Sequence, residues 1–237
     1  SNSSGSITST VQANTTAGIS IVKYDGTGSN ATVGHGLGVA PAAIIMKNYT
    51  RTAAQSWIVA HRNLPSGFND AIFLDLTNAK DTDSGYWNNT SPTSTVFSIG
   101  TNNKCNGNGD AHIAYCFAQK TGFSKFGSYP GNGLTNGPFI YTGFKPAWVM
   151  IKRTDDTANW HIYDNKRDDS NVVEQALQAN TSAAEFTTSN KLDFYSNGFK
   201  STAANQSTTN TSGGNYIYMA FAENPFVSSA GVPATAR

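Results

Sequence analysis

The chain has 237 residues, enough for one large domain or two of ordinary size. Charged residues make up only 13% and the formal net charge is +1, so the chain lacks the basic surface with which proteins displace counterions from nucleic-acid phosphates. No apolar run approaches the roughly 20 residues of a membrane-spanning helix. We therefore expect a folded protein with no nucleic-acid partner and no membrane insertion.

Residues 1–18 are rich in Ser, Thr, Asn and Gly. They show neither a basic segment nor an apolar segment of the kind that makes a secretory signal, so we expect a linker or an N-terminal extension. The two cysteines, Cys105 and Cys116, are too few for a disulfide framework. We expect both to be free thiols, with Cys116 in the core.

The most informative feature of the sequence is an internal repeat. The stretch VAPAAIIMKN at 39–48 returns as FKPAWVMIKR at 144–153, and HIAYCFA at 112–118 returns as YIYMAFA at 216–222. Two further blocks, KYDGTG with SYPGNG and WIVAHR with WHIYDN, recur in the same order at nearly the same offset. Fixed-period self-similarity of this kind indicates repeated structural units.

The repeat predicts two homologous units of about 104 residues, at 19–122 and 123–227, followed by a C-terminal tail at 228–237. The junction between the units has no Pro-rich or Ser-rich linker, which favours two units packed together. Whether they are separate sandwiches or one body stays open at this point.

Each unit is expected to consist of short antiparallel strands, because runs rich in β-branched and aromatic residues alternate with Gly, Asn, Asp, Ser and Pro. This pattern predicts an all-β, sandwich-like fold. A helix-like composition at 171–184 is outweighed by its repeat counterpart, so it too is expected as a strand. The predicted strands of the first unit are 20–24, 31–35, 42–49, 56–61, 71–76, 95–99 and 112–118.

The segment Gly26 to Ala31 fits the dinucleotide fingerprint G-x-G-x-x-A. That motif requires a helix immediately afterwards, whose N-terminus holds the pyrophosphate. The sequence continues as TVGHGLG, without helical periodicity, so a Gly-rich hairpin turn is the better interpretation.

Metal and catalytic motifs are weak throughout. The segment at 81–85, DTDSG, resembles the start of a calcium loop but lacks the later ligands, and the acid pairs at 155–156 and 168–169 are expected to be solvated. His35, His61, His112 and His161 share no metal-ligand spacing. No nucleophile elbow occurs, and nothing selects a pair of carboxylates. We expect no cofactor, no metal and no enzymatic activity.

The aromatic residues suggest a different kind of site. Trp57 and Trp160 are repeat equivalents and are expected in the core, whereas Trp148 and the pair Phe194-Tyr195 have no such equivalence. Aromatic faces beside Asn side chains can stack on sugar rings and bond their hydroxyls. The candidate glycan contact is the run Tyr86, Trp87, Asn88 and Asn89, although the same residue types would serve a subunit interface.

Three long phrases resemble a domain found in virion proteins of marine tailed phages. They are GSITSTVQANTTAGISIVKYDGTGSNATVGHGLGVAPAAIIMKN, FSKFGSYPGNGLTNGPFIYTGFKPAWVMIKR and the ending NYIYMAFAENPF. The resemblance covers residues 6–226, nearly the whole chain. It implies a structural, tail-fibre-like or capsid-decoration protein on the surface of the particle, and it brings no catalytic residues with it.

We therefore expect a non-enzymatic virion protein that assembles with other copies of itself and with other virion proteins. A homo-oligomer is expected, with a trimer among the forms that it could take. The alternative is a receptor-binding, lectin-like module that recognises host surface glycan. A bacterial adhesin or hydrolase domain is the weaker third hypothesis.

Overall fold

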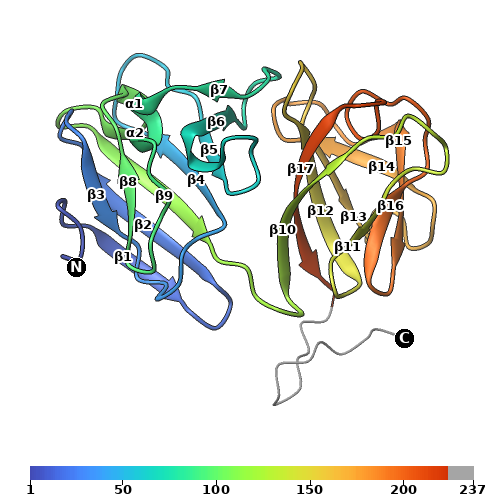
Figure 1. Cartoon of the computed structure of the whole chain (residues 1–237), viewed down its shortest axis with the longest axis horizontal. Helices are drawn as coiled ribbons and strands as arrows, with labels where there is room; N and C mark the ends of the chain where they lie inside the picture. Colours follow the sequence, from blue (N-terminus) through green and yellow to red (C-terminus); the bar gives the residue numbers. More distant parts are fainter. Residues whose placement is uncertain (224–237) are drawn as a thin grey trace. The chain divides into compact units, whose positions relative to one another are not determined.

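The computed structural model describes residues 1–223 and divides into two compact units (Figure 1). The first unit comprises Ser1–Asp75 and Lys80–Gln119, and the second comprises Leu76–Ala79 and the chain from Lys120 onward. The expected tail at 228–237 and the last residues expected for the second unit lie outside the described residues. Strands dominate both units, so the expected all-β fold class is confirmed.

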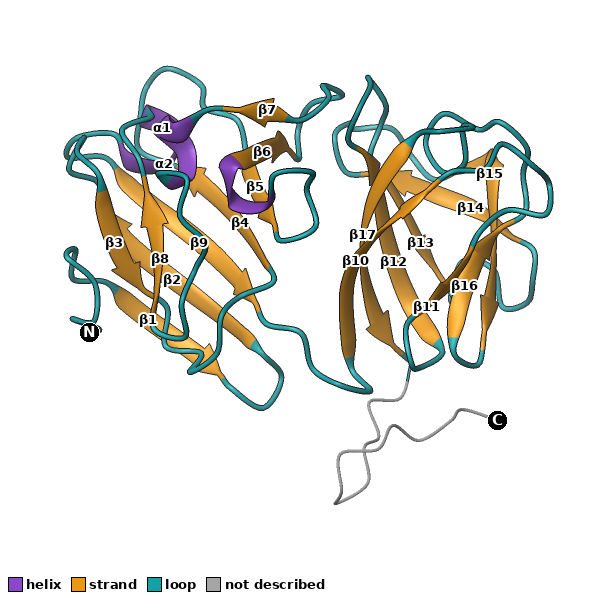
Figure 2. Ribbon diagram, in the orientation of Figure 1, coloured by secondary structure: helices purple, strands orange, loops and turns teal. Residues whose placement is uncertain are grey.

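The elements of the first unit include three short helical turns, seen as the purple ribbons in Figure 2. Among the described residues, no helix is long and apolar enough to cross a membrane. In chain order the elements are β1 (Thr10–Asn14), β2 (Ile19–Asp25), β3 (Ala31–Gly34), β4 (Ala43–Asn48), β5 (Ile58–His61), η1 (Gly67–Asn69), β6 (Asp70–Phe73), β7 (Asp81–Thr82), α1 (Ser84–Trp87), β8 (Val96–Ile99), α2 (Asn103–Asn106) and β9 (Ala111–Phe117).

The described part of the second unit is built from strands alone. They are β10 (Ser124–Pro130), β11 (Phe139–Tyr141), β12 (Pro146–Arg153), β13 (His161–Asp164), β14 (Val173–Gln178), β15 (Phe186–Tyr195), β16 (Gly198–Ser201) and β17 (Asn215–Ala222).

The two units share one sheet topology. The large sheet of the first unit has the order β1-β2-β9-β4-β5-β6-β7, and β3 pairs with β8 in a second layer. The second unit has the order β10-β17-β12-β13-β14-β15-β16-β11. The central orders β2-β9-β4-β5-β6 and β10-β17-β12-β13-β14 correspond strand for strand, as do the pairs β3-β8 and β11-β16. The prediction of two homologous sandwich-like units is therefore confirmed.

The units differ in how their layers are joined. In the second unit the ten-residue strand β15 pairs with both β14 and β16, so a single sheet curls around the core. In the first unit the equivalent stretch forms only the two-residue β7 and the turn α1. The β3-β8 pair of the first unit is therefore a separate two-stranded sheet.

Buried and more exposed residues alternate along the central strands of the first unit. In β9 every second residue is buried, and β2 alternates in the same way, so one face of each strand enters the core. In β10 the alternation breaks between Phe126 and Tyr129, which are both buried. The ring of Tyr24 meets that of Phe97 edge to face with centroids 6.2 Å apart. Tyr129 and Phe199 repeat this contact at 6.3 Å in the second unit. The repeat thus extends to the packing of the two layers.

All seven strands expected in the first unit are present, as β2, β3, β4, β5, β6, β8 and β9. The segment at 171–184 contains β14, as expected from the repeat rather than from its helix-like composition. Residues 1–18 are part of the first unit, where β1 pairs with β2.

Candidate functional site

The side chains expected to contact glycan lie largely inside the first unit. Tyr86 is 3% exposed and Trp87 is 1% exposed, so neither ring has a face available for a sugar. The Tyr86 hydroxyl donates a hydrogen bond to Asp81 at 2.8 Å, and burial together with this carboxylate raises the pKa of Tyr86 well above its usual value. The structure therefore corrects the expectation of an exposed aromatic surface here.

Asn88 and Asn89 have a structural explanation. Both adopt left-handed backbone conformations, with φ of 51° and 47°, and Asn88 caps the end of α1. Asn is among the residues that tolerate this conformation. The Asn88 side chain also accepts a hydrogen bond from Asn30 at 2.9 Å. The two residues close the turn through their backbone conformation, and the Asn88 amide holds a neighbouring loop. Asn89 itself is exposed.

The histidines and cysteines are all buried. His112 stacks on Tyr24 with centroids 5.1 Å apart, as Tyr216 stacks on Tyr129 at 5.1 Å. His112 therefore shares a packing role with its repeat equivalent Tyr216. Each histidine is at most 2% exposed: His35, His61, His112 and His161.

Burial also determines the chemistry of the thiols. Both cysteines are free and buried, as expected, and burial raises the pKa of each to about 12. The Cys105 thiol donates toward the carbonyl of Tyr86 at 3.1 Å. A protonated, enclosed thiol is a poor nucleophile.

The acidic residues that resembled a calcium loop hold local structure instead. Asp83 caps α1 by accepting the N–H of Gly85 at 2.8 Å, and Asp81 accepts the Tyr86 hydroxyl. Within residues 1–223, His, Cys, Asp and Glu side chains form no group of three that could hold a metal ion.

The glycine motif that resembles a nucleotide fingerprint is held by a buried asparagine. Asn106 accepts the N–H of Thr27 through Oδ1 at 2.7 Å. Its Nδ2 donates to the carbonyls of Ser29 at 2.7 Å and Gly100 at 2.6 Å. These bonds fix the loop that follows β2, and Asn106 itself has no exposed surface.

Asn210 repeats this arrangement in the second unit. Its Oδ1 accepts the N–H groups of Asn132 at 2.9 Å and Gly133 at 3.4 Å. Its Nδ2 donates to the carbonyls of Leu134 at 2.7 Å and Ala203 at 3.1 Å. We call these two arrangements the asparagine clamps.

The clamps correct the hairpin interpretation of the glycine motif. The loop leads from β2 to β3, which lie in different sheets and do not pair with each other. A strand, not a helix, follows the motif, and the Thr27 N–H is already occupied by Asn106. The loop therefore has neither the helix N-terminus nor the free amides that a pyrophosphate requires.

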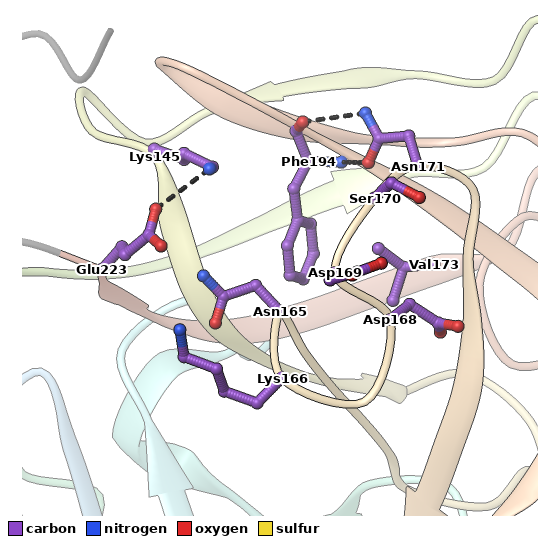
Figure 3. Close-up of a pocket in the computed structure, with 10 residues that line it drawn as sticks. All are labelled: Lys145, Asn165, Lys166, Asp168, Asp169, Ser170, Asn171, Val173, Phe194 and Glu223. Atoms are coloured by element: carbon purple, nitrogen blue, oxygen red, sulfur yellow. Dashed lines mark hydrogen bonds and ion pairs between the residues drawn. The ribbon is translucent and has the colours of Figure 1, made fainter.

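A polar pocket lies at one end of the second unit. It is a pocket of about 270 Å³ between the 165–171 loop, β15 and the ends of β12 and β17. Figure 3 shows the ring of Phe194 pointing toward Asn165 and Asp169. Val173 adds a second apolar group to the lining.

Several contacts hold the walls of the pocket. The Asn171 amide accepts the N–H of Phe194 at 2.9 Å and donates to its carbonyl at 3.0 Å (Figure 3). Asp168 accepts two main-chain N–H groups at the start of β14, at 2.8 and 2.7 Å. Lys145 pairs with Glu223 at 3.0 Å. At the start of the loop the N–H of Asn165 donates to the carbonyl of Ala147 at 3.0 Å, so the loop is fixed at both of its ends.

Four polar side chains of this loop have no hydrogen-bond partner among the described residues. They are Asn165, Lys166, Asp169 and Ser170, and all four line the pocket. An apolar floor with convergent donors and acceptors suits a small polar ligand with a hydrophobic face. Sequence reasoning noted Asp168-Asp169 and Phe194 separately, and the structure brings them together.

The other aromatic residues divide between core and surface. Trp160 is buried, as expected, whereas its equivalent Trp57 is half-buried. Trp148 is half-buried and packs on Phe221 with centroids 5.6 Å apart. Tyr195 is exposed, on the opposite face of β15 from Phe194.

A family model for a domain of unknown function, DUF7483, matches residues 1–225. Comparison with curated proteins and with solved structures gives no match.

Proposed function

The chain belongs to the DUF7483 family, and we propose that it is a non-enzymatic structural protein of a tailed-phage virion. It would form part of a fibre, a tail or a capsid decoration, on the surface of the particle. Its partners would be other copies of itself and other virion proteins. The phrases of the sequence that resemble marine phage virion proteins support this role.

The duplicated asparagine clamp is the observation that carries the proposal. Asn106 and Asn210 both fix the loop that joins the two layers of their unit. Both units therefore use their buried polar side chains to maintain one shape, as repeated building blocks do. The burial of every histidine and thiol fits a role in which reactive groups have no part.

Mass spectrometry of density-purified particles from the phage that encodes the chain tests this proposal. Peptides from both units should co-purify with the capsid and tail proteins in a fixed ratio. Their absence from infectious particles would refute the virion role. Light scattering of the isolated chain checks the assembly, for which we expect a stable oligomer at micromolar concentration.

Binding of host surface glycan is the second candidate function. The pocket over Phe194 favours it, because an aromatic ring beside unpartnered polar side chains can hold the apolar face and the hydroxyls of a sugar. The proposed contact would lie in the second unit rather than at Tyr86 and Trp87.

Glycan-array binding of the full chain tests this candidate. Asn165→Ala and Asp169→Ala should each remove binding, because both side chains line the pocket. Asp25→Ala is a matched control, since Asp25 is an exposed acid at the end of β2 in the first unit. Binding that survives both pocket substitutions would exclude this site.

A further inference from the structure

One sheet edge is covered in the first unit by the chain's own N-terminal segment. Residues 2–9 run beside β3, where Ile7 forms a parallel bridge with Val33. The N–H of Ile7 donates to the carbonyl of Thr32 at 3.0 Å. The N–H of Thr32 donates to the hydroxyl of Ser6 at 2.9 Å. The outward main-chain groups of Thr32 are thus satisfied.

Side chains complete this cover. Ile7 is 8% exposed and joins the core of the first unit. The hydroxyl of Ser9 donates to the carbonyl of Gly34 at 2.8 Å. A Cβ added to Gly34 would lie 2.1 Å from Oδ1 of Asn2, so the segment lies directly against this residue.

The strand β11 is the counterpart of β3 in the second unit. Val33 pairs with Phe97 across β3 and β8, and both side chains are fully buried. Ile140 pairs with Phe199 across β11 and β16, with Ile140 6% exposed and Phe199 fully buried. The buried pairs therefore align the two edges residue by residue.

The direction of the main-chain groups on β11 follows from the ladder. The N–H of Thr142 donates to the carbonyl of Asn197, so the main-chain N–H and C=O groups of Thr142 point toward β16. Hydrogen bonding alternates along an antiparallel strand, so the main-chain groups of Ile140 also point toward β16. The N–H and C=O groups of Phe139 and Tyr141 therefore point outward, away from β16.

These two residues lack the cover that their counterparts have. Phe139 corresponds to Thr32 and Tyr141 to Gly34, yet their side chains are 48% and 63% exposed. No described residue forms a hydrogen bond with the outward main-chain groups of Phe139 or Tyr141. Within residues 1–223, the edge of β11 is therefore open at the position where the edge of β3 is filled.

We propose that the edge of β11 binds an extended segment of another polypeptide as an added parallel strand. The first unit defines the chemistry of this partner: an uncharged segment with a β-branched apolar residue between two hydroxyl residues, as in Ser6-Ile7-Thr8. Open strand edges are the usual acceptors of such segments. The proposal is independent of the virion role.

Amide hydrogen exchange of the full chain, followed by NMR, tests this assignment. The probe is a synthetic peptide with the sequence SNSSGSITSTVQ, residues 1–12 of the chain. The amides of Phe139 and Tyr141 should exchange quickly in the free chain and slow by about tenfold or more when the peptide is in large excess. The amide of Ile140, already paired with β16, should be slow in both states and serves as an internal reference.

Edge variants separate strand addition from other binding modes. Tyr141→Pro removes an outward N–H without removing a bond to β16, and it should abolish the slowing at Phe139. If Tyr141→Pro does not fold, Tyr141→Lys blunts the same edge with a charge. Tyr195→Ser removes a ring that contacts Phe139 at 5.7 Å but leaves the edge intact, so it should retain binding.

Three results would overturn the proposal. The first is unchanged exchange at Phe139 and Tyr141 with peptide in excess. The second is a change of chemical shift confined to Thr32 and its neighbours, which would mean that the peptide only replaces the segment on β3. The third is binding lost in Tyr195→Ser but kept in Tyr141→Pro, which would assign this face to a ligand of the aromatic rings.

Discussion

Asn106 and Asn210 occupy equivalent positions in the two units, and each joins the loop after the first core strand to the layer opposite. Both side chains are fully buried. Each forms hydrogen bonds through Oδ1 and Nδ2 to main-chain groups that have few other partners. The same long-range contact thus maintains the same shape twice in one chain.

Asn106→Ala and Asn210→Ala should each destabilise their own unit. Each substitution removes the hydrogen bonds of several main-chain groups. One group in each clamp is buried, the carbonyl of Gly100 or the N–H of Gly133, and leaving such a group unpaired costs about 1–3 kcal/mol. Urea denaturation should show a lowered midpoint for the transition of the altered unit. Asn108→Ala is the matched control, because Asn108 is an exposed amide nearby, and its midpoint should be unchanged. Equal midpoints for Asn106→Ala and Asn108→Ala would contradict the clamp.

Two glycines in the clamped loops should not tolerate substitution by alanine. A Cβ on Gly26 would lie 2.3 Å from the carbonyl oxygen of Gly107, and one on Gly131 would lie 2.2 Å from that of Thr211. Because main-chain atoms must move to admit it, Gly26→Ala should lower the free energy of unfolding by about 2 kcal/mol or more. Thermal unfolding measures this effect.

Gly109→Ala is the control for this experiment. Gly109 has a φ of 73° but open space around it, so alanine there meets only backbone strain, worth about 1 kcal/mol. If Gly109→Ala proved as costly as Gly26→Ala, close packing would not be the reason for glycine at position 26.

Much of the fold could be predicted because its signals are local or duplicated. The alternation in β9 marks a strand by itself. The composition of β14 indicates a helix, and only its repeat counterpart favoured a strand. The repeat also identified the two units, because equivalent blocks must occupy equivalent places in the fold.

The candidate sites could not be predicted for equally physical reasons. Tyr86 and Trp87 lie in α1, a single turn of four residues, which is too short for periodicity to reveal which side chains are buried. Asn106 lies in a polar segment, and its burial depends on contacts with Thr27 and Ser29 far away in the sequence. The repeat aligns Asn106 with Asn210, and that was the one signal that could have identified the clamp.

His161 should make the second unit sensitive to acid. Its ring is enclosed by Tyr163, Gln178, Phe186 and Thr208, and burial lowers its pKa from 6.5 to about 4. Between these values the unfolded chain binds a proton that the folded chain does not. Stability is therefore unaffected above pH 6.5 and falls by up to about 3 kcal/mol as the pH drops toward 4.

Urea denaturation at several pH values measures this dependence. Between pH 6.5 and 4, His161→Gln should reduce the slope of the free energy of unfolding against pH by an amount close to that of one proton. This holds even if the substitution lowers the free energy of unfolding at neutral pH. A variant with the same slope as the parent chain would show that His161 is not the group responsible.

The two thiols should be inert in the folded chain. Burial keeps Cys105 and Cys116 protonated and enclosed, with a pKa of about 12 each. A chromogenic disulfide reagent should therefore label neither thiol in native buffer and both in denaturant. The variant Cys105→Ser should release half of the signal in denaturant. Rapid labelling of the native chain would contradict the burial of these side chains.

Cryo-electron microscopy of the tailed-phage particles proposed to carry the chain tests the virion role most directly. The account predicts density for both sandwich units at symmetry-related positions on a fibre, a tail or the capsid surface. A reconstruction in which every surface component is assigned to other proteins would contradict it.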